Sequence, residues 1–295
     1  MRRSEALVGL ALAPFSALAA CAPNISGITR TNGLPDHPTA FGSQLYPSDD
    51  VAQAISLLAG CGSTLVRVTA SDDLPYFDVL FPAAKAHGMR VIVISSYAPQ
   101  PVDVDAYAAK AAAFQQRYAA YDPMWEIWNE PNLSIYWGAA PNVGNYATLT
   151  IATAKALRAA GARDVLSGGT SGVDINWIYG LLTNNVFEAV TACAVHSYEK
   201  PSKALNKYLQ VMSLLPRGTP IYTTEACVVT NNDQVTFFRD MWSLHRQLSL
   251  PGLVWCEFRD GSAGPAPPFN DPMGLVTANY LPKRVYFTAQ SSLGV

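Results

Sequence analysis

Two glutamates stand where apolar, strand-like runs stop. Glu130 follows the run 125–129, and the proline after it has no N–H for a strand ladder, so regular pairing ends there. Glu225 ends a second such run, Pro-Ile-Tyr-Thr-Thr. If the fold brings these two carboxyl groups together, one can act as a general acid and base and the other as a nucleophile. The elements before each glutamate therefore have to be strands that meet at one edge.

Strand-like and helix-like segments alternate along the chain, a pattern typical of parallel β/α architecture. The apolar runs predict eight strands, at 25–30, 64–69, 90–95, 125–130, 165–168, 190–195, 220–224 and 253–258. We therefore expect an α/β protein, a single-domain (β/α)8 TIM barrel over residues 21–295. The main alternative, an open doubly wound sheet, usually carries a glycine-rich turn after its first strand, and this sequence has none. Active sites of barrels lie at the C-terminal strand ends, where both glutamates fall.

The composition limits the partners. The chain is 49% hydrophobic and 14% charged, with a formal net charge of −2 and no basic stretch. This balance permits one large core and argues against nucleic-acid binding, which depends on clustered lysines and arginines. Neutral polymers or small molecules are the expected partners.

The first twenty residues predict a signal peptide. Arg2 and Arg3 precede the apolar run 6–20, which is too short to span a bilayer as a helix. Leu18-Ala19-Ala20-Cys21 resembles a bacterial lipobox, in which Cys21 is lipidated and becomes the mature N-terminus. We expect a lipid-anchored protein of the cell envelope. Ordinary cleavage nearby, which would give a periplasmic or secreted protein, remains the alternative.

The four other cysteines, at positions 61, 193, 227 and 256, could form two disulfides in an oxidising compartment. Cys193 and Cys256 lie inside strand-like runs, where a free cysteine commonly behaves as a small buried hydrophobe. The cysteine and histidine spacing matches no structural zinc motif, so neither a metal nor a cofactor is expected.

The octet 125–132, Trp-Glu-Ile-Trp-Asn-Glu-Pro-Asn, resembles the acid/base motif of clan A glycoside hydrolases. Together with the following Tyr136-Trp137 and Tyr146, it is similar to family 39 and its exopolysaccharide-cleaving relatives. The resemblance implies that Glu130 is the acid/base on strand four and Glu225 the nucleophile on strand seven. Retaining hydrolysis needs two such carboxyl groups about 5–5.5 Å apart.

The resemblance also implies substrate-binding roles. His196 and Tyr198 form the His-x-Tyr at the end of the sixth strand, and Tyr198 could donate a hydrogen bond to Glu225. Trp255 occupies the position of the aromatic floor beneath the reacting sugar, and Trp137 is a weaker candidate for sugar stacking. Arg67 corresponds to an arginine near the nucleophile.

Three residues of the octet depend on which way strand four faces. Strict alternation points Trp128 and Glu130 into the same cavity and Asn129 away from it. The resemblance assigns Asn129 to the 2-hydroxyl of the sugar, which requires a bulge or twist at the strand end. Glu126 is expected deeper in the barrel, bound to an arginine in a structural role.

The expected function is a retaining glycoside hydrolase. Family 39 xylosidases carry an accessory β-domain that this compact chain does not accommodate, so we expect an endo-acting monomer that cleaves a β-linked polysaccharide. Two alternatives remain: a transglycosylase in polysaccharide assembly, which would use the same two glutamates, and a surface lipoprotein that binds glycans without turnover.

Overall fold

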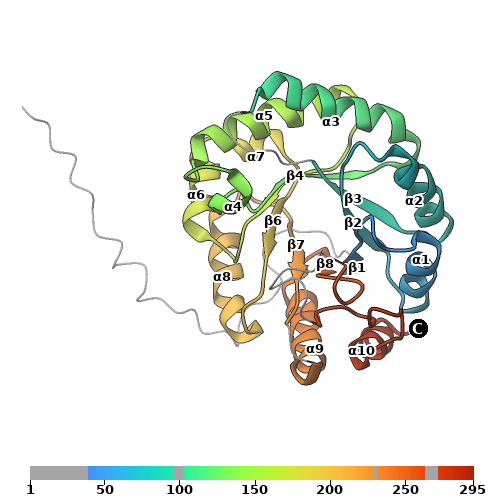
Figure 1. Cartoon of the computed structure of the whole chain (residues 1–295). Coiled ribbons are helices and arrows are strands. Elements are labelled where there is room, and N and C mark those ends of the chain that lie inside the picture. Colours follow the sequence, from blue (N-terminus) through green and yellow to red (C-terminus); the bar gives the residue numbers. More distant parts are fainter. Residues whose placement is uncertain (1–38, 96–101, 229–230, 263–271) are drawn as a thin grey trace, which may run out of the picture. The chain divides into compact units, whose positions relative to one another are not determined.

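A ring of eight parallel strands forms the centre of the protein, with helices packed around it (Figure 1). The computed structural model describes residues 39–95, 102–228, 231–262 and 272–295. The strands are β1 (Ala40–Gln44), β2 (Leu65–Thr69), β3 (Arg90–Ile94), β4 (Met124–Asn129), β5 (Val165–Gly169), β6 (Cys193–His196), β7 (Ile221–Ala226) and β8 (Gly252–Trp255). They pair in the order β5-β4-β3-β2-β1-β8-β7-β6.

The ring closes between β5 and β6. Parallel bridges join Leu166 to Ala192 and Thr170 to Val195. The amide of His196 donates to the carbonyl of Thr170 at 2.9 Å, so pairing continues up to the C-terminal end of both strands. The sheet is therefore the predicted (β/α)8 barrel.

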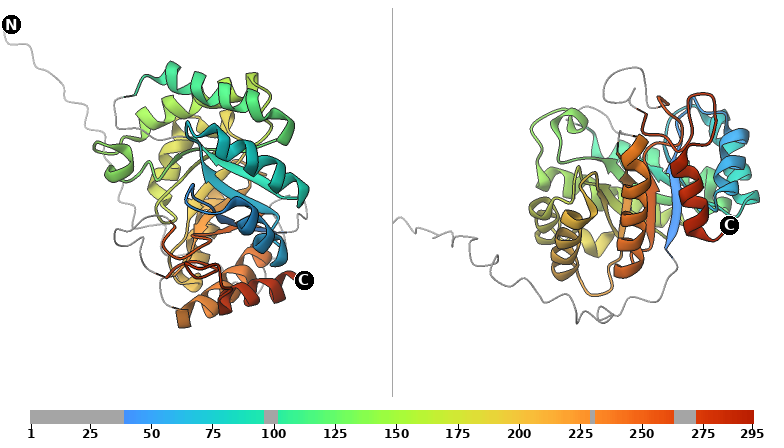
Figure 2. Two further views of the ribbon diagram at one scale, coloured as in Figure 1. Left: turned by 45° about the vertical axis from the view of Figure 1, so that its right-hand side comes forward. Right: turned by 90° about the horizontal axis from the view of Figure 1, so that it is seen from below.

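The helices pack outside the strands. They are α1 (Val51–Gly60), α2 (Leu74–Ala86), α3 (Val104–Tyr118), α4 (Ser134–Trp137), α5 (Val143–Ala159), α6 (Ile175–Thr183), α7 (Val186–Ala189), α8 (Pro201–Leu214), α9 (Asn231–Leu248) and α10 (Arg284–Leu293), with a 3-10 turn, η3, at Ala119–Tyr121. Side-chain oxygens cap several N-termini. Asp103 accepts from the amides of Asp105 and Ala106 at the start of α3. Figure 2 shows α9 and α10 side by side. Within the described residues, no helix is long and apolar enough to cross a membrane.

The core has two layers. A small inner cluster fills the barrel toward the N-terminal ends of the strands, and a larger outer cluster fills the space between strands and helices. The inner cluster includes Leu65, Ile92, Met124, Leu166 and Val254. Above it, toward the C-terminal strand ends, the inward positions carry polar and charged side chains. The apolar floor thus confines the polar groups to one end of the barrel.

Seven predicted strands are confirmed, each within three residues of its observed bounds. The first strand is Ala40–Gln44, and the segment predicted for it, 25–30, lies outside the described residues, as do the signal sequence and Cys21. Helices α4, α6, α7 and α10 were not predicted. The four described cysteines are buried and free.

Candidate active site

The end of β4 breaks the alternation of the strand. Trp128 and Glu130 both have positive φ angles, 74° and 43°, which are uncommon for residues other than glycine. The turn at Trp128 moves Asn129 to the inside, where its Oδ1 accepts a hydrogen bond from Arg67 Nη2 at 3.1 Å. The bulge or twist that would turn Asn129 toward the barrel interior is therefore present at the end of β4. Such strained backbone persists where the surroundings hold it, often at functional sites.

Trp128 does not enter the barrel with Glu130, contrary to the expectation from strict alternation. Its ring lies 5.2 Å from that of Trp137 and 5.6 Å from that of Tyr107, centroid to centroid. Trp137 is 2% exposed and packs edge-on against Tyr146. A ring buried in this way cannot stack on a sugar, so the prediction for Trp137 is corrected: this cluster holds the backbone that presents Glu130.

Arg67 connects the polar groups inside the barrel. It is fully buried on β2, and its guanidinium donates to both oxygens of Glu126, at 2.7 and 3.0 Å. Its Nη1 also donates to Glu225 Oε1 and to Gln44 Oε1. Burial lowers the pKa of Arg67, but the two carboxylates outweigh this effect and raise it above its ordinary value. Arg67 therefore carries a permanent positive charge beside Glu225.

Glu126 has the structural environment that was predicted. Its Oε1 accepts hydrogen bonds from the Gly169 amide at 2.9 Å and from Thr224 Oγ1 at 3.0 Å, in addition to Arg67. Burial alone would raise the pKa of this carboxyl, yet Arg67 and His196 hold it at about 2. A fully buried carboxylate with this many donors is satisfied and remains ionised.

Glu225, at the C-terminal end of β7, is held in the ionised form by three neighbours. Arg67 donates to its Oε1, and the Tyr198 hydroxyl donates to its Oε2, as predicted. Burial raises the pKa of Glu225, but His196, Arg67 and the Tyr198 hydrogen bond together lower it below its usual value. Tyr198 is 40% exposed, so this residue borders both the carboxylate and the solvent.

His196 lies between the two glutamates. Its Nδ1 is 2.8 Å from Glu130 Oε1 and 3.5 Å from Glu225 Oε2. Burial lowers the pKa of this imidazole, but Glu225 and hydrogen bonds with Glu126 and Glu130 raise it to about 9. Space for the ring depends on Gly169, because a Cβ there would overlap Nε2 and would lie 2.8 Å from Glu126 Oε1.

The barrel brings the two predicted catalytic glutamates together. Ligand atoms of Glu130, His196 and Glu225 all lie within 4.8 Å of one another, and both glutamates are buried, with 6% and 8% of their surface exposed. One oxygen of each carboxyl group thus lies within 4.8 Å of the other, so the two groups can act on the same bond of a bound molecule.

The same three residues have donor atoms that a metal ion accepts, but their partners do not suit a cation. Both oxygens of Glu225 already accept hydrogen bonds, one of them from the guanidinium of Arg67. The pKa of His196, about 9, keeps its ring protonated at neutral pH, whereas a metal ligand must be neutral. The arrangement fits acid–base and nucleophilic chemistry better than metal binding.

Trp255 does not reach the site, and its predicted role is corrected. The side chain is fully buried and points away from the barrel interior, against Phe237 and Phe238 of α9. Its indole N–H donates to the carbonyl of Met273 at 2.7 Å. Neighbouring residues of a strand point to opposite faces, and Val254 of β8 points inward, into the inner cluster. Trp255, the next residue, therefore points outward.

Two site residues at the end of β1 escaped the sequence analysis. Gln44 accepts from the same Arg67 nitrogen that binds Glu225. Tyr46 follows β1 by two residues. Burial raises the pKa of its hydroxyl most, and Cys256 and the Glu225 carboxylate raise it further, so the hydroxyl interacts electrostatically with Glu225. Because the first strand was predicted at 25–30, no residue of β1 was a candidate for the site.

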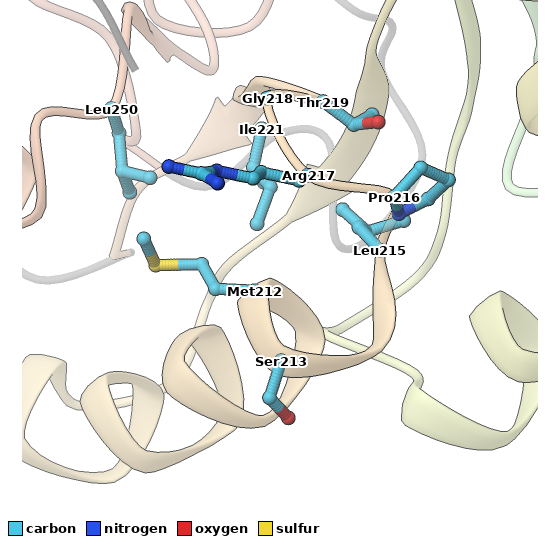
Figure 3. Close-up of a pocket in the computed structure, with 9 residues that line it drawn as sticks. All are labelled: Met212, Ser213, Leu215, Pro216, Arg217, Gly218, Thr219, Ile221 and Leu250. Atoms are coloured by element: carbon cyan, nitrogen blue, oxygen red, sulfur yellow. The ribbon is translucent and has the colours of Figure 1, made fainter. Parts of the chain in front are cut away.

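A separate pocket lies at the N-terminal end of β7, whereas Glu225 lies near the C-terminal end of this strand (Figure 3). It has a volume of ≈ 240 Å³ and is lined by Met212, Ser213, Leu215, Pro216, Arg217, Gly218, Thr219, Ile221 and Leu250. Arg217 is the one charged side chain among these lining residues. The pocket therefore lacks the paired carboxyl groups found at the other end of the barrel.

No protein-family model and no curated protein sequence matches the chain. The structure is similar to a monomeric β-xylosidase from Caulobacter crescentus CB15, with a TM-score of 0.70 and 19% identity over 88% of this chain and 68% of that one. A family 39 glycoside hydrolase from Bacteroides cellulosilyticus WH2 gives a TM-score of 0.71 and 16% identity over 89% and 65%.

An endo-β-1,4-glucanase from Xanthomonas axonopodis pv. citri, solved with a triple mutation, gives a TM-score of 0.65 and 14% identity over 87% of this chain and 99% of that one. The chain thus spans about two thirds of the first two proteins and nearly all of the third. At these identities the likeness establishes the architecture, and the chain has the (β/α)8 fold that family 39 glycoside hydrolases share with this endoglucanase.

Proposed function

We propose that the protein is a retaining glycoside hydrolase that cleaves a β-linked polysaccharide, with Glu225 as nucleophile and Glu130 as acid/base. The observation that carries the proposal is the placement of both carboxyl groups within 4.8 Å, at the C-terminal end of the barrel. The reaction needs a nucleophile and an acid/base. The ionised carboxylate beside Arg67 suits the first role, and the carboxyl group beside the histidine suits the second.

In the first step, Glu225 attacks the anomeric carbon while Glu130 protonates the departing glycosidic oxygen, which leaves a covalent glycosyl-enzyme. In the second step, Glu130 takes a proton from water, and the resulting nucleophile releases the sugar from Glu225. The hydrogen bond from His196 Nδ1, 2.8 Å long, connects Glu130 to a group that retains its proton up to a pH of about 9. Arg67 and Tyr198 keep Glu225 ionised for attack.

Asn129 and Tyr198 are the proposed sugar contacts. The Oδ1 of Asn129 is engaged by Arg67, which leaves the amide N–H groups to donate to a sugar hydroxyl. Tyr198 combines an exposed ring with a hydroxyl on the nucleophile, so a sugar bound at Glu225 would also meet this ring. Arg67 and His196 act on the substrate through the carboxyl groups that they position.

Internal cleavage is the proposed mode of action. The chain covers 99% of the endoglucanase from Xanthomonas axonopodis pv. citri, a protein named for cutting within β-1,4-glucan. Incubation with a panel of β-linked polysaccharides, followed by size analysis of the products, tests this mode. Early release of mixed oligosaccharides supports it, whereas release of single sugars contradicts it. Products longer than the supplied acceptor would identify a transglycosylase.

A 2-deoxy-2-fluoro glycoside of the accepted sugar tests the nucleophile, because such a compound traps the glycosyl-enzyme. We expect the label on the peptide that contains Glu225 and no label on the Glu225→Ala variant. Glu130→Ala should lower turnover of unactivated substrates by about 10²–10⁴-fold, the usual contribution of a general acid. Glu188→Ala, at an exposed position of α7, is the matched control. Unchanged turnover in Glu225→Ala would refute the assignment and would favour a glycan-binding protein.

We also propose that the protein is an envelope lipoprotein and a monomer. The support is the apolar run 6–20 followed by Leu-Ala-Ala-Cys21. Cys21→Ala should move the protein from the membrane fraction to the soluble fraction, and mass spectrometry of the membrane form should show diacylglyceryl on the N-terminal cysteine. Gel filtration with light scattering checks the monomer. A membrane-bound Cys21→Ala variant would contradict lipidation at this cysteine.

A further inference from the structure

Three sulfur atoms gather beside the site, on the β7 and β8 side of the barrel. Cys227 directly follows β7, and Cys256 directly follows β8. The strands pair at Ala226 and Trp255, and the Cys256 amide donates to the Ala226 carbonyl at 3.2 Å, so the two cysteines come next in register. Their thiols are hydrogen-bonded to each other.

Met273 supplies the third sulfur. Its Sδ lies 3.6 Å from the Sγ of Cys227, and its carbonyl is held by the indole N–H of Trp255 at 2.7 Å. The chain therefore brings the thioether to the thiols from a distant segment and fixes it there. The three residues are buried, with 2% to 8% of their surface exposed.

Cys256 lies in the same space as the catalytic groups. It contributes to the electrostatic environment of Tyr46, after β1, and of Tyr198, after β6. The hydrogen bond from Cys227, burial and the negative charge of Glu225 all raise the pKa of the Cys256 thiol. The Cys256 thiol therefore keeps its proton until a metal ion displaces it.

We propose that Cys227, Cys256 and Met273 form a binding site for a soft monovalent metal ion of the copper(I) type. Thiolate and thioether donors together select soft ions such as Cu(I) over Mg²⁺ or Ca²⁺. Two sulfurs 3.6 Å apart subtend an angle of about 100° at a metal bound at about 2.3 Å from each. One ion can thus bind both without a large movement of the backbone.

Binding requires no oxidant or reductant. Each thiol that coordinates gives its proton to the solvent as the sulfur–metal bond forms, and the thioether binds through a lone pair. The site is separate from Glu130, His196 and Glu225, whose contacts do not suit a metal.

Silver(I) is a suitable probe, because it is a soft monovalent ion that does not change oxidation state in air. Native mass spectrometry of the reduced full-length chain, in chloride-free buffer, would count the bound ions. We expect the wild type to bind one more silver ion than Cys256→Ser. Met273→Leu, which keeps the volume of the side chain, should weaken binding by about 10–100-fold. Cys61→Ser is the matched control, since Cys61 is buried elsewhere, beside Leu58 and Ser63.

Equal silver binding by wild type and Cys256→Ser, or an unchanged affinity in Met273→Leu, would overturn the proposal. A disulfide between Cys227 and Cys256 in the native protein, visible as a loss of two mass units without reductant, would overturn it as well. These readouts do not depend on hydrolysis, so they separate this inference from the proposed function.

Discussion

Replacing Glu126 with glutamine should destabilise the barrel at neutral pH. The change keeps the shape of the side chain and removes the charge that pairs with Arg67. Burial opposes ionisation of Glu126, but Arg67 and His196 bring its pKa from the ordinary value of 4.5 down to about 2. Since one pKa unit corresponds to about 1.4 kcal/mol, the ionised form stabilises the folded protein by about 3 kcal/mol. The free energy of unfolding of Glu126→Gln should therefore fall by about this amount at pH 7.

The direction of the pH dependence follows from the lowered pKa. The stabilisation is complete above the unfolded pKa of 4.5 and is lost as the pH falls toward about 2. The difference between wild type and Glu126→Gln should therefore shrink to less than half at pH 3. Urea unfolding followed by circular dichroism at pH 7 and pH 3 measures both values.

Asp78→Asn is the control for this prediction. Asp78 pairs with Arg117 on the surface, where both side chains are 47% exposed, so water screens the interaction and its loss should change stability little. If Glu126→Gln unfolded like wild type at pH 7, or lost as much stability at pH 3 as at pH 7, the buried ion pair would not stabilise the fold as argued.

Three further predictions concern the same network. Because the pKa of His196 is raised in the folded protein, its protonated ring stabilises the fold fully below pH 6.5, and this stabilisation is lost as the pH rises through about 9. Wild-type stability should therefore decline across this range, and that of His196→Gln should not. Tyr198→Phe removes a donor from Glu225, which should raise the pKa of that carboxyl and shift the acidic limb of the kcat/KM profile upward; an unmoved limb would exclude the role. Gly169→Ala should displace His196 and lower both turnover and melting temperature, whereas Gly144→Ala, whose Cβ would meet no atom closer than 3.4 Å, should leave both unchanged.

The barrel was predictable because its strands are short apolar runs separated by helical patterns. Parallel strands are buried on both faces, so most of their residues are apolar and the strands are visible in a single sequence. The first strand was the exception: Ala-Phe-Gly-Ser-Gln contains one large apolar residue. Because this pattern is weak, the first strand was predicted at 25–30 instead, and Gln44 and Tyr46 were not candidates for the site.

The aromatic residues show the limit of sequence reasoning. Trp137 and Trp255 were expected to stack on sugars, and both are buried against other rings. A tryptophan near a strand end has the same pattern in either role, because its direction depends on the local backbone. At Trp128 that backbone has a positive φ, which strict alternation does not predict.

The sequence by itself determined the order of the elements and the two glutamates at strand ends, since both depend on local patterns and on the position of a residue within an apolar run. Tertiary structure alone decided which groups meet. Closure of the barrel places Glu126, Glu130 and Glu225 around one arginine and one histidine, and the pKa values of Arg67, Glu126, His196 and Glu225 depend on that shared burial. Charges interact strongly where water is excluded, and no local pattern records which charges will be buried together.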